Sequence, residues 1–442
     1  MLKTHIRKIG AIVLLSVMPM LAHAADESLE KAAALIKANK YSAAYDLLEP
    51  LESDRAGDPN FDYLFGVAAV QNGKATRGVF ALERVLAVQP NNSNARAFIA
   101  RAYFQLGEKD IAKSEFQHTL DQHPSAEIAK AINDYMGAID KSLGLVTTYN
   151  AYIEATTGHD SNINGATSYG SFSIPGGTIT LNSPSFLEKS DNFMMVNAGA
   201  SFRTPVAKNL DVFASGSTMQ RVNLHEQDFD TGSYDANVGL RYKKGIDTYS
   251  VALQDSNYYF DSQRFRHSYG ASGQWQRDLN AANQVNLFAQ AAKLVYPDQS
   301  DRDANRYVVG GGWAHVFAGD KSPVIFLSGY VGKEDTKHSG ISDDIYGNNL
   351  YGTRLGSQMA LTPKWIAFSN AGYEYRDYNG DTPIFLKTRQ DDQYDLGVGL
   401  RYLGKVWTVK PQVTYLHNDS NLAINDYDRT VFSVSFRHDF NW

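Results

Sequence analysis

Segments in which apolar and polar side chains alternate strictly dominate the second part of the chain. From Tyr394 to Tyr402 every odd step is apolar or aromatic and every residue between is polar or glycine, and Tyr234 to Tyr242 repeats this pattern closely. A period of two indicates β-strands with one apolar face. Aromatic residues at both ends of an apolar row are typical of the girdles of an outer-membrane barrel, whose polar face lines a wet lumen. A soluble β-sandwich is the alternative.

Fourteen such segments can be counted between residues 143 and 442, and short and long connections alternate between them. The short connections include 206–208, 244–245, 280–282, 363–364 and 404–405, and the long ones 158–190, 223–231, 334–347 and 378–391. Short periplasmic turns and long outer loops produce this rhythm. We therefore predict an α + β membrane protein in which residues 143–442 form a 14-stranded antiparallel transmembrane β-barrel.

The composition changes near residue 142. Of the 53 Phe, Tyr and Trp residues only 11 lie in residues 1–142, together with 7 of the 35 glycines. Long stretches rich in Ala, Leu, Lys and Glu take their place, which predicts helices. The first part is therefore expected to be helical and the second to consist of strands and turns.

The helical part repeats with a period of 34 residues, so that Gly66 corresponds to Ala100 and Gly78 to Ala112. This spacing resembles the tetratricopeptide repeat, in which small residues let paired helices cross closely. We expect an α-solenoid of three repeats, about residues 26–58, 59–92 and 93–126, and a closing helix near 126–141. An ordinary helical bundle is the alternative.

A stack of such repeats lines a concave groove with the first helix of each repeat. By the usual geometry of the repeat, the residues facing this groove are Asn60, Tyr63, Val67, Gln71, Asn94, Arg101, Phe104 and Gln105. The resemblance implies that the groove binds peptide segments of a client protein. The alternative is that the domain is only a spacer.

The amino terminus has the form of a secretory signal peptide. Lys3, Arg7 and Lys8 precede an apolar run over 9–21, and small residues at 22 and 24 suit a cleavage site. We expect a signal peptide at 1–24, a periplasmic tetratricopeptide domain at 25–142 and the barrel at 143–442. The chain has no cysteine and a net charge of −6, which excludes thiolate metal sites and argues against nucleic-acid binding. No cofactor and no metal are expected.

Four arginines fall on the polar phase near the inner ends of predicted strands, namely Arg203, Arg241, Arg401 and Arg437. In the lumen they could meet acidic cargo. They could equally pair with Asp235 and Asp395 and so stiffen the wall.

The first predicted strand is followed by Gly158-His159-Asp160-Ser161-Asn162-Ile163-Asn164. This segment resembles a Gly-Tyr-Asp-Ser-Asn-Val-Asn stretch in outer-membrane proteins of the surface lipoprotein assembly modulator family. His159 replaces the aromatic residue and Ile163 replaces Val. The family joins a short periplasmic tetratricopeptide domain to a 14-stranded barrel. The Asp and Asn side chains could contact cargo, or they could shape the loop through bonds to the backbone.

The resemblance implies a non-enzymatic secretor that captures periplasmic client proteins and passes them through or alongside its barrel. Clients of this family include surface lipoproteins and soluble haem-binding proteins. The implied partners are the client, periplasmic chaperones, the outer-membrane assembly machinery and the lipid bilayer, with no nucleic acid. A polysaccharide-export porin is the alternative. An outer-membrane lipase would need a Ser–His pair near the rim, for which His267-Ser268 is the candidate to examine.

Overall fold

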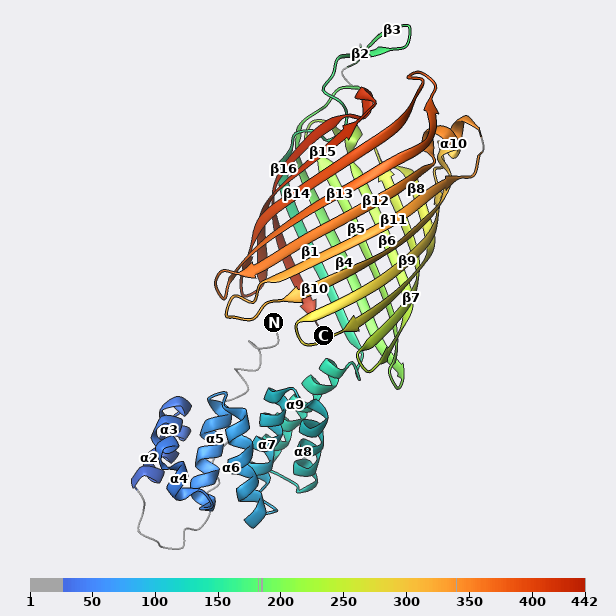
Figure 1. Ribbon diagram of the computed structural model, residues 1–442. Coiled ribbons are helices and arrows are strands. Elements are labelled where there is room, and N and C mark those ends of the chain that lie inside the picture. Colours follow the sequence, from blue (N-terminus) through green and yellow to red (C-terminus); the bar gives the residue numbers. More distant parts are fainter. Residues whose placement is uncertain (1–26, 182, 184–185, 339, 442) are drawn as a thin grey trace. The chain divides into compact units, whose positions relative to one another are not determined.

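The computed structural model describes residues 27–181, 183, 186–338 and 340–441, so the expected signal peptide at 1–24 lies outside the described residues. The chain divides between Val146 and Thr147 into a helical unit and a β unit (Figure 1). Within the described part of the chain, no helix combines the length and the apolar character needed to cross a membrane.

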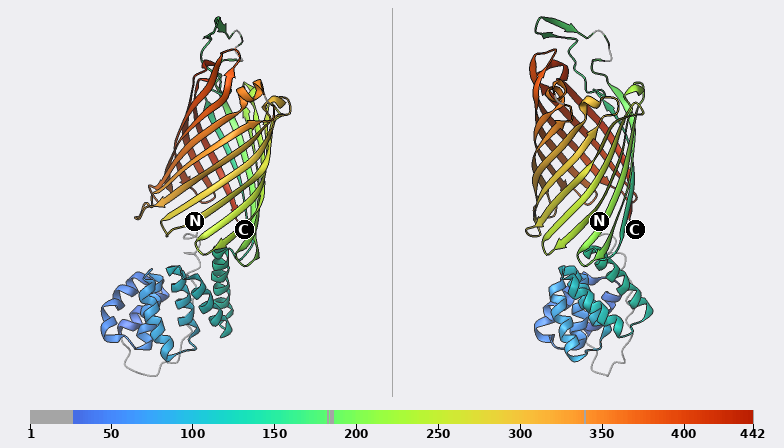
Figure 2. Two further views of the ribbon diagram at one scale, coloured as in Figure 1. Left: turned by 45° about the vertical axis from the view of Figure 1, so that its right-hand side comes forward. Right: turned by 90° about the vertical axis from the view of Figure 1, so that its right-hand side faces the viewer.

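Three successive helix pairs and a closing helix form the first unit (Figure 2). The pairs are α2 (Glu27–Lys37) with α3 (Tyr41–Leu48), α5 (Pro59–Gln71) with α6 (Ala75–Val88), and α7 (Ser93–Leu106) with α8 (Lys109–Asp121). The 3₁₀ turn η2 (Glu49–Leu51) and α4 (Glu52–Arg55) follow the first pair, and α9 (Ala126–Leu143) closes the stack. The predicted tetratricopeptide solenoid is confirmed.

Glycine permits the close crossing of α5 and α6. A Cβ atom added to Gly66 would lie 2.5 Å from Cγ of Leu82, and one added to Gly78 would lie 2.4 Å from Cγ2 of Val70. Both contacts are shorter than two carbon atoms allow, so a larger residue would push the helices apart. Gly73, with φ of 77°, makes the turn between the two helices.

Side-chain caps define where the helices begin. Asp58 accepts hydrogen bonds from the amides of Asn60 and Phe61 at the start of α5. Partial burial alone would raise the pKa of Asp58, but the Arg55 guanidinium and these amides outweigh it and hold the pKa below its usual value. Asn92 and Ser125 cap α7 and α9 in the same way.

Fourteen strands form a closed antiparallel barrel, as predicted. The register that closes it runs from Asn150 opposite Asn441 to Asp160 opposite Val431. The strands are β1 (Thr148–Asp160), β4 (Asp191–Ala207), β5 (Leu210–Asn223), β6 (Thr231–Lys244), β7 (Asp247–Phe260), β8 (Gln263–Asp278), β9 (Asn283–Val295), β10 (Ala304–Val316), β11 (Val324–Thr336), β12 (Asn348–Ala360), β13 (Trp365–Thr382), β14 (Lys387–Leu403), β15 (Trp407–Ser420) and β16 (Tyr427–Asn441).

The two ends of the barrel differ in their connections. We call the end where β1 starts and β16 finishes the turn end, and the opposite end the loop end. The loop end carries a hairpin of β2 (Ser171–Ile174) and β3 (Gly177–Thr180), the helix α10 (Ile341–Tyr346), and the 3₁₀ turns η4 (Gln227–Phe229), η5 (Ser300–Arg302) and η6 (Ala423–Asn425). None of these short elements was expected from the sequence.

One predicted loop is wrong. Residues 378–391 do not form a long connection, because β13 and β14 continue into them and only residues 383–386 join the strands. Asp381 pairs with Thr388 and Thr382 with Lys387, beyond an irregularity at Asp377. The polar composition of this segment therefore marks strands that extend past the others.

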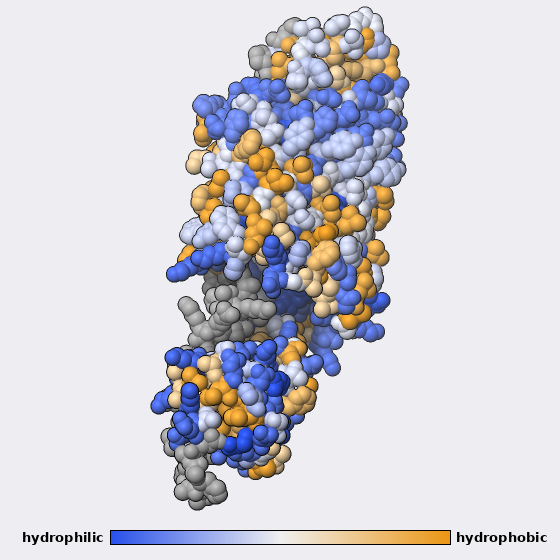
Figure 3. Space-filling model, turned by 60° about the vertical axis from the view of Figure 1, so that its left-hand side comes forward, coloured by the Kyte–Doolittle hydropathy of each residue, from blue (hydrophilic) through white to orange (hydrophobic). Residues whose placement is uncertain are grey.

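The strands alternate between an apolar outer face and a polar inner face. On β6 the apolar side chains of Val238 and Leu240 are about half exposed, whereas Nδ2 of Asn237, the residue before Val238, donates to Oγ of Ser215 at 2.7 Å. Figure 3 shows apolar side chains spread over the barrel wall. The exposed apolar band is the surface that a lipid bilayer would cover.

Candidate functional site

The predicted groove residues of the helical unit lie on α5 and α7, but they are not equally accessible. Asn60 and Gln105 are exposed, whereas Tyr63 is mostly covered and its burial raises the pKa to about 12. Val67 is only 3% exposed and belongs to the core between α5, α6 and α7. The expectation that Val67 faces a client is wrong, because this side chain fills the space between helices.

A mixed aromatic and basic cluster joins α7 to α9. The guanidinium carbon of Arg101 lies 5.9 Å from the ring centre of Tyr135, and the ring of Phe104 meets the same ring edge-on at 6.0 Å. The hydroxyl of Tyr135 is buried without a hydrogen-bond partner among the described residues. Asn94 on α7 and Gln71 on α5 are partly exposed. Arg101 therefore presents a charge on a rigid aromatic support.

The segment Gly158–Asn164 ties the barrel closure together through Asp160. This carboxylate is fully buried and accepts from Nη2 of Arg221 on β5 at 2.7 Å and from Nη2 of Arg429 on β16 at 2.6 Å. Ser161 binds across the seam as well, since its Oγ accepts from the amide of Thr430 at 2.8 Å. Gly158 is required at this point, because a Cβ there would lie 2.2 Å from the carbonyl oxygen of Phe432.

The two asparagines of the segment hold the following loop. Nδ2 of Asn162, a buried side chain, donates to the carbonyl oxygens of Ala166 and Asp428. Asn164 spans the loop instead, donating to the carbonyl of Leu187 and accepting from the amide of Lys189. These contacts favour the loop-shaping interpretation over a direct cargo contact.

The four predicted lumen arginines lie near the turn end and have partners other than the expected ones. Arg203 and Arg241 share Asp211, at 3.2 and 2.6 Å. Arg437 bonds to Asp439 at 2.8 Å and covers the ring of Tyr152, and Arg401 lies over Phe368. The alternative of pairing with Asp235 and Asp395 is wrong for these two partners: Asp235 accepts from Ser256, and Asp395 pairs with Arg354.

Sequence reasoning missed a second set of arginines at the loop end. Besides Arg221 and Arg429, this end holds Arg266, Arg302, Arg306, Arg376 and Arg389. Arg306, Arg376 and Arg429 lie on the inner face close to the loop-end termini of β10, β13 and β16. The alternation of apolar and polar residues along the strands, which predicted the turn-end arginines, could also have predicted these three.

The Ser–His pair that an outer-membrane lipase would need does not form at the candidate residues. His267 and Ser268 are neighbours on β8, so their side chains point to opposite faces of the sheet. Nε2 of His267 lies 2.6 Å from Oδ2 of Asp255 instead. His159 and Asp160 diverge for the same reason, and Asp160 is occupied by two guanidinium groups.

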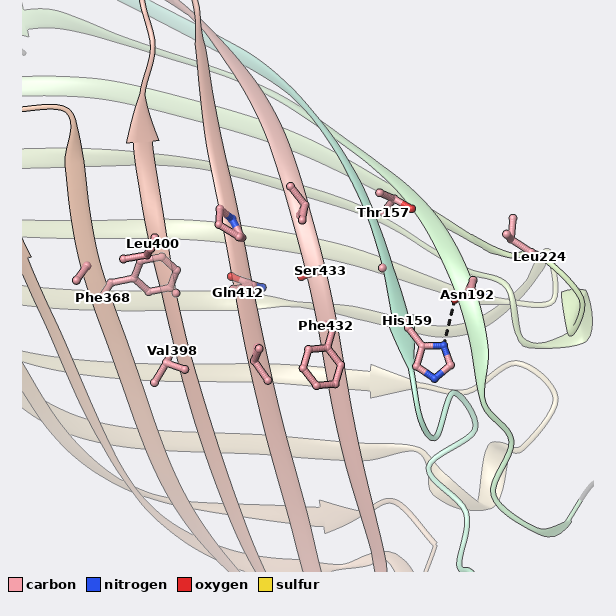
Figure 4. A pocket seen from close by; sticks show the side chains of 16 residues that line it. Thr157, His159, Asn192, Leu224, Phe368, Val398, Leu400, Gln412, Phe432 and Ser433 are labelled. Carbon is pink, nitrogen blue, oxygen red and sulfur yellow. Dashed lines mark hydrogen bonds between the residues drawn. The ribbon is translucent and has the colours of Figure 1, made fainter.

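A groove of about 1040 Å³ crosses the outer wall over β13 to β16, β1 and β4 (Figure 4). Exposed apolar side chains such as Val398, Leu400 and Phe432 line it. At one end Nδ1 of His159 lies 3.1 Å from Oδ1 of Asn192. Exposed apolar side chains on the outer wall are typical of a barrel surface that contacts lipid.

A tetratricopeptide solenoid followed by a closed 14-stranded barrel with an apolar outer band defines an outer-membrane β-barrel protein with a helical domain. Residues 149–440 match the model of the surface lipoprotein assembly modifier family, and residues 69–134 match a tetratricopeptide repeat model. The chain belongs to the surface lipoprotein assembly modifier family, which confirms the resemblance of the Gly158–Asn164 segment and supports a role in surface-lipoprotein assembly at the outer membrane.

Several solved structures resemble one or the other unit. MamA of MSR-1 is 23% identical over 26% of this chain and 66% of its own, with a TM-score of 0.24. The toluene transporter TodX of P. putida is 8% identical over 67% of this chain and 90% of its own, with a TM-score of 0.35. A bacterial polysaccharide outer membrane secretin is 11% identical over 66% of this chain and 98% of its own, with a TM-score of 0.33. No curated protein matches the chain.

Proposed function

We propose that the protein is a non-enzymatic secretor that captures client proteins with its helical domain and passes them to the cell surface or the medium through its barrel. The observation that supports this is the presence, in one chain, of tetratricopeptide repeats and a barrel that matches the surface lipoprotein assembly modifier family. Surface lipoproteins are the first class of client to test, and soluble haem-binding proteins the second.

The proposed orientation places the turn end in the periplasm. An even number of strands brings the start of β1 and the finish of β16 to the same end, as their register requires. The longer connections, including 161–190 and 337–347, would then face the outside, as in other outer-membrane barrels. The helical domain precedes β1 and would therefore meet clients before they enter the barrel.

Arg101 is the residue we assign to client contact in the helical domain. It has no carboxylate partner among the residues that the structure describes, and it rests on the ring of Tyr135. A guanidinium held in this way can bind a carboxylate of a client peptide at a small entropic cost. Asn94 and Gln105, on the same helix, add donors and acceptors on either side of it.

The test is co-expression with each neighbouring lipoprotein gene in a heterologous Gram-negative host, followed by detection of the client on intact cells. We expect display only when this protein is present. An Arg101→Ala/Asn94→Ala variant should leave client in the periplasm while the barrel still reaches the outer membrane. Lys130→Ala removes an exposed charge from α9 and serves as the matched control. Equal display with and without this protein would refute the proposal.

A further inference from the structure

A second cavity, of about 480 Å³, lies at the loop end of the barrel. It is bounded by the inner face of β10 to β14, the turn η5 and the helix α10, whose position at the rim is visible in Figure 1. Five arginines reach it from separate elements, namely Arg266, Arg302, Arg306, Arg376 and Arg389. These five guanidinium groups carry five positive charges. Among the described residues, fewer carboxylates than arginines lie beside them, so the cavity is not fully neutralised.

Three of the five arginines are neutralised by a neighbouring carboxylate. Arg306 pairs with Glu334 at 2.7 Å and Arg376 with Glu374 at 2.7 Å. The third pair joins Arg389 to Asp391 at 2.6 Å. Arg266 and Arg302 have no carboxylate partner among the residues that the structure describes, which leaves the cavity with two uncompensated positive charges.

Arg302 is held in place by aromatic rings. Its guanidinium carbon lies 4.8 Å from the ring centre of Tyr296, 5.4 Å from that of Phe265 and 5.5 Å from that of Tyr346. Nη1 donates to Oε1 of Gln299 at 2.9 Å, the one hydrogen bond of this guanidinium to the described residues. A guanidinium fixed by stacking retains donors for a ligand and loses little entropy on binding.

One unused acceptor lines the same cavity. Asn348 is 2% exposed and its Nδ2 donates to the carbonyl oxygen of Tyr346 at 3.0 Å, which identifies the other atom as the oxygen. This Oδ1 has no hydrogen-bond partner in the described part of the chain. A buried acceptor without a donor costs free energy, so it is matched best by a ligand that carries an O–H.

We propose that this cavity is a binding site for a phosphate group with an O–H beside it, which is supplied either by hydrogen phosphate itself or by a sugar hydroxyl of a phosphosugar. The forks of Arg266 and Arg302 match the paired oxygens of phosphate, and Oδ1 of Asn348 accepts the ligand hydroxyl. The source is either free phosphate or a phosphorylated sugar headgroup at the membrane surface. This inference stands apart from the proposed secretion of a client.

The test uses the full-length protein in detergent and isothermal titration with inorganic phosphate. We expect saturable binding at one site, weakened about tenfold or more by Arg266→Gln and by Arg302→Gln, because each removes charge-assisted hydrogen bonds. Arg302→Lys should be intermediate, since it keeps the charge without the fork. Arg264→Gln, an exposed arginine two residues from Arg266, is the matched control and should bind as the parent does. Unchanged thermal unfolding shows that each variant remains folded.

Three further probes decide between ligands. Sulfate at neutral pH has no O–H and should bind at least about tenfold more weakly than phosphate. Glucosamine 6-phosphate binding more tightly than phosphate would identify the headgroup as the source, and equal affinity would identify free phosphate. The proposal is overturned if phosphate fails to saturate, if the arginine variants bind as tightly as the parent, or if sulfate or a glutamate-rich peptide binds better than phosphate.

Discussion

At the scale of single residues, the ion pair between the buried Asp62 and the partly buried Arg84 links two helices of the helical unit. Asp62 is fully buried and accepts from Nε and Nη2 of Arg84 at 3.0 and 2.6 Å, and from the amide of Gly57. Asp62→Ala removes the partner of a partly buried charge and should lower the free energy of unfolding by about 3 kcal/mol. Denaturation followed by helical circular dichroism measures it. Asp46→Ala, at an exposed site, should change stability by less than about 0.5 kcal/mol.

Replacing glycine with alanine should change the free energy of unfolding in opposite directions at two positions in the helices. Gly66→Ala places a Cβ against Leu82 and should destabilise the unit by about 1–3 kcal/mol. Gly137, inside α9, has no atom within 4 Å of the added Cβ, so Gly137→Ala should stabilise by about 0.5–1 kcal/mol through helix propensity. Thermal unfolding of both variants checks this. A stabilised Gly66→Ala would contradict the close crossing.

At the scale of elements, Asp160 joins three strands, and its replacement should loosen the closure of the barrel. Asp160→Asn leaves Arg221 and Arg429 without their shared carboxylate. We expect the compact form seen on unheated SDS gels to convert at a lower temperature, with faster hydrogen exchange in β1 and β16. Asp298→Asn, in an exposed loop, is the control and should convert as the parent does. Unchanged conversion for Asp160→Asn would show that the backbone register alone holds the seam.

The elements were far more predictable from the sequence than their side-chain partners. The period of 34 residues and the alternation with a period of two depend on the local chain, and both gave the correct architecture. The partner of Arg241 depends on which residue of β5 lies opposite, and the register places Asp211 there. Val67 fits the pattern of a groove residue, but the approach of α6 and α7 buries it. Such contacts are set by tertiary geometry, which a single sequence does not specify.

At the scale of the whole molecule, the route of the client depends on whether the seam between β1 and β16 opens. Eleven pairs of described residues close it, and Asp160–Arg429 and the Oγ1–Oγ contact of Thr156 with Ser435 at 2.9 Å strengthen it. Opening would expose unpaired backbone groups to lipid, at several kcal/mol for each group. We therefore expect the client to pass through the polar lumen while the seam remains closed.

A disulfide across the seam tests this expectation, and the absence of native cysteine makes the result easy to interpret. Thr156→Cys/Ser435→Cys should lock β1 to β16 on oxidation without changing client display. Ser357→Cys/Ser369→Cys, whose hydroxyls are also 2.9 Å apart on β12 and β13, is the matched control. Display is measured on intact cells before and after reduction, and gel mobility reports the extent of crosslinking. If oxidation stops display in the seam variant alone and reduction restores it, the client leaves between β1 and β16 rather than through the lumen.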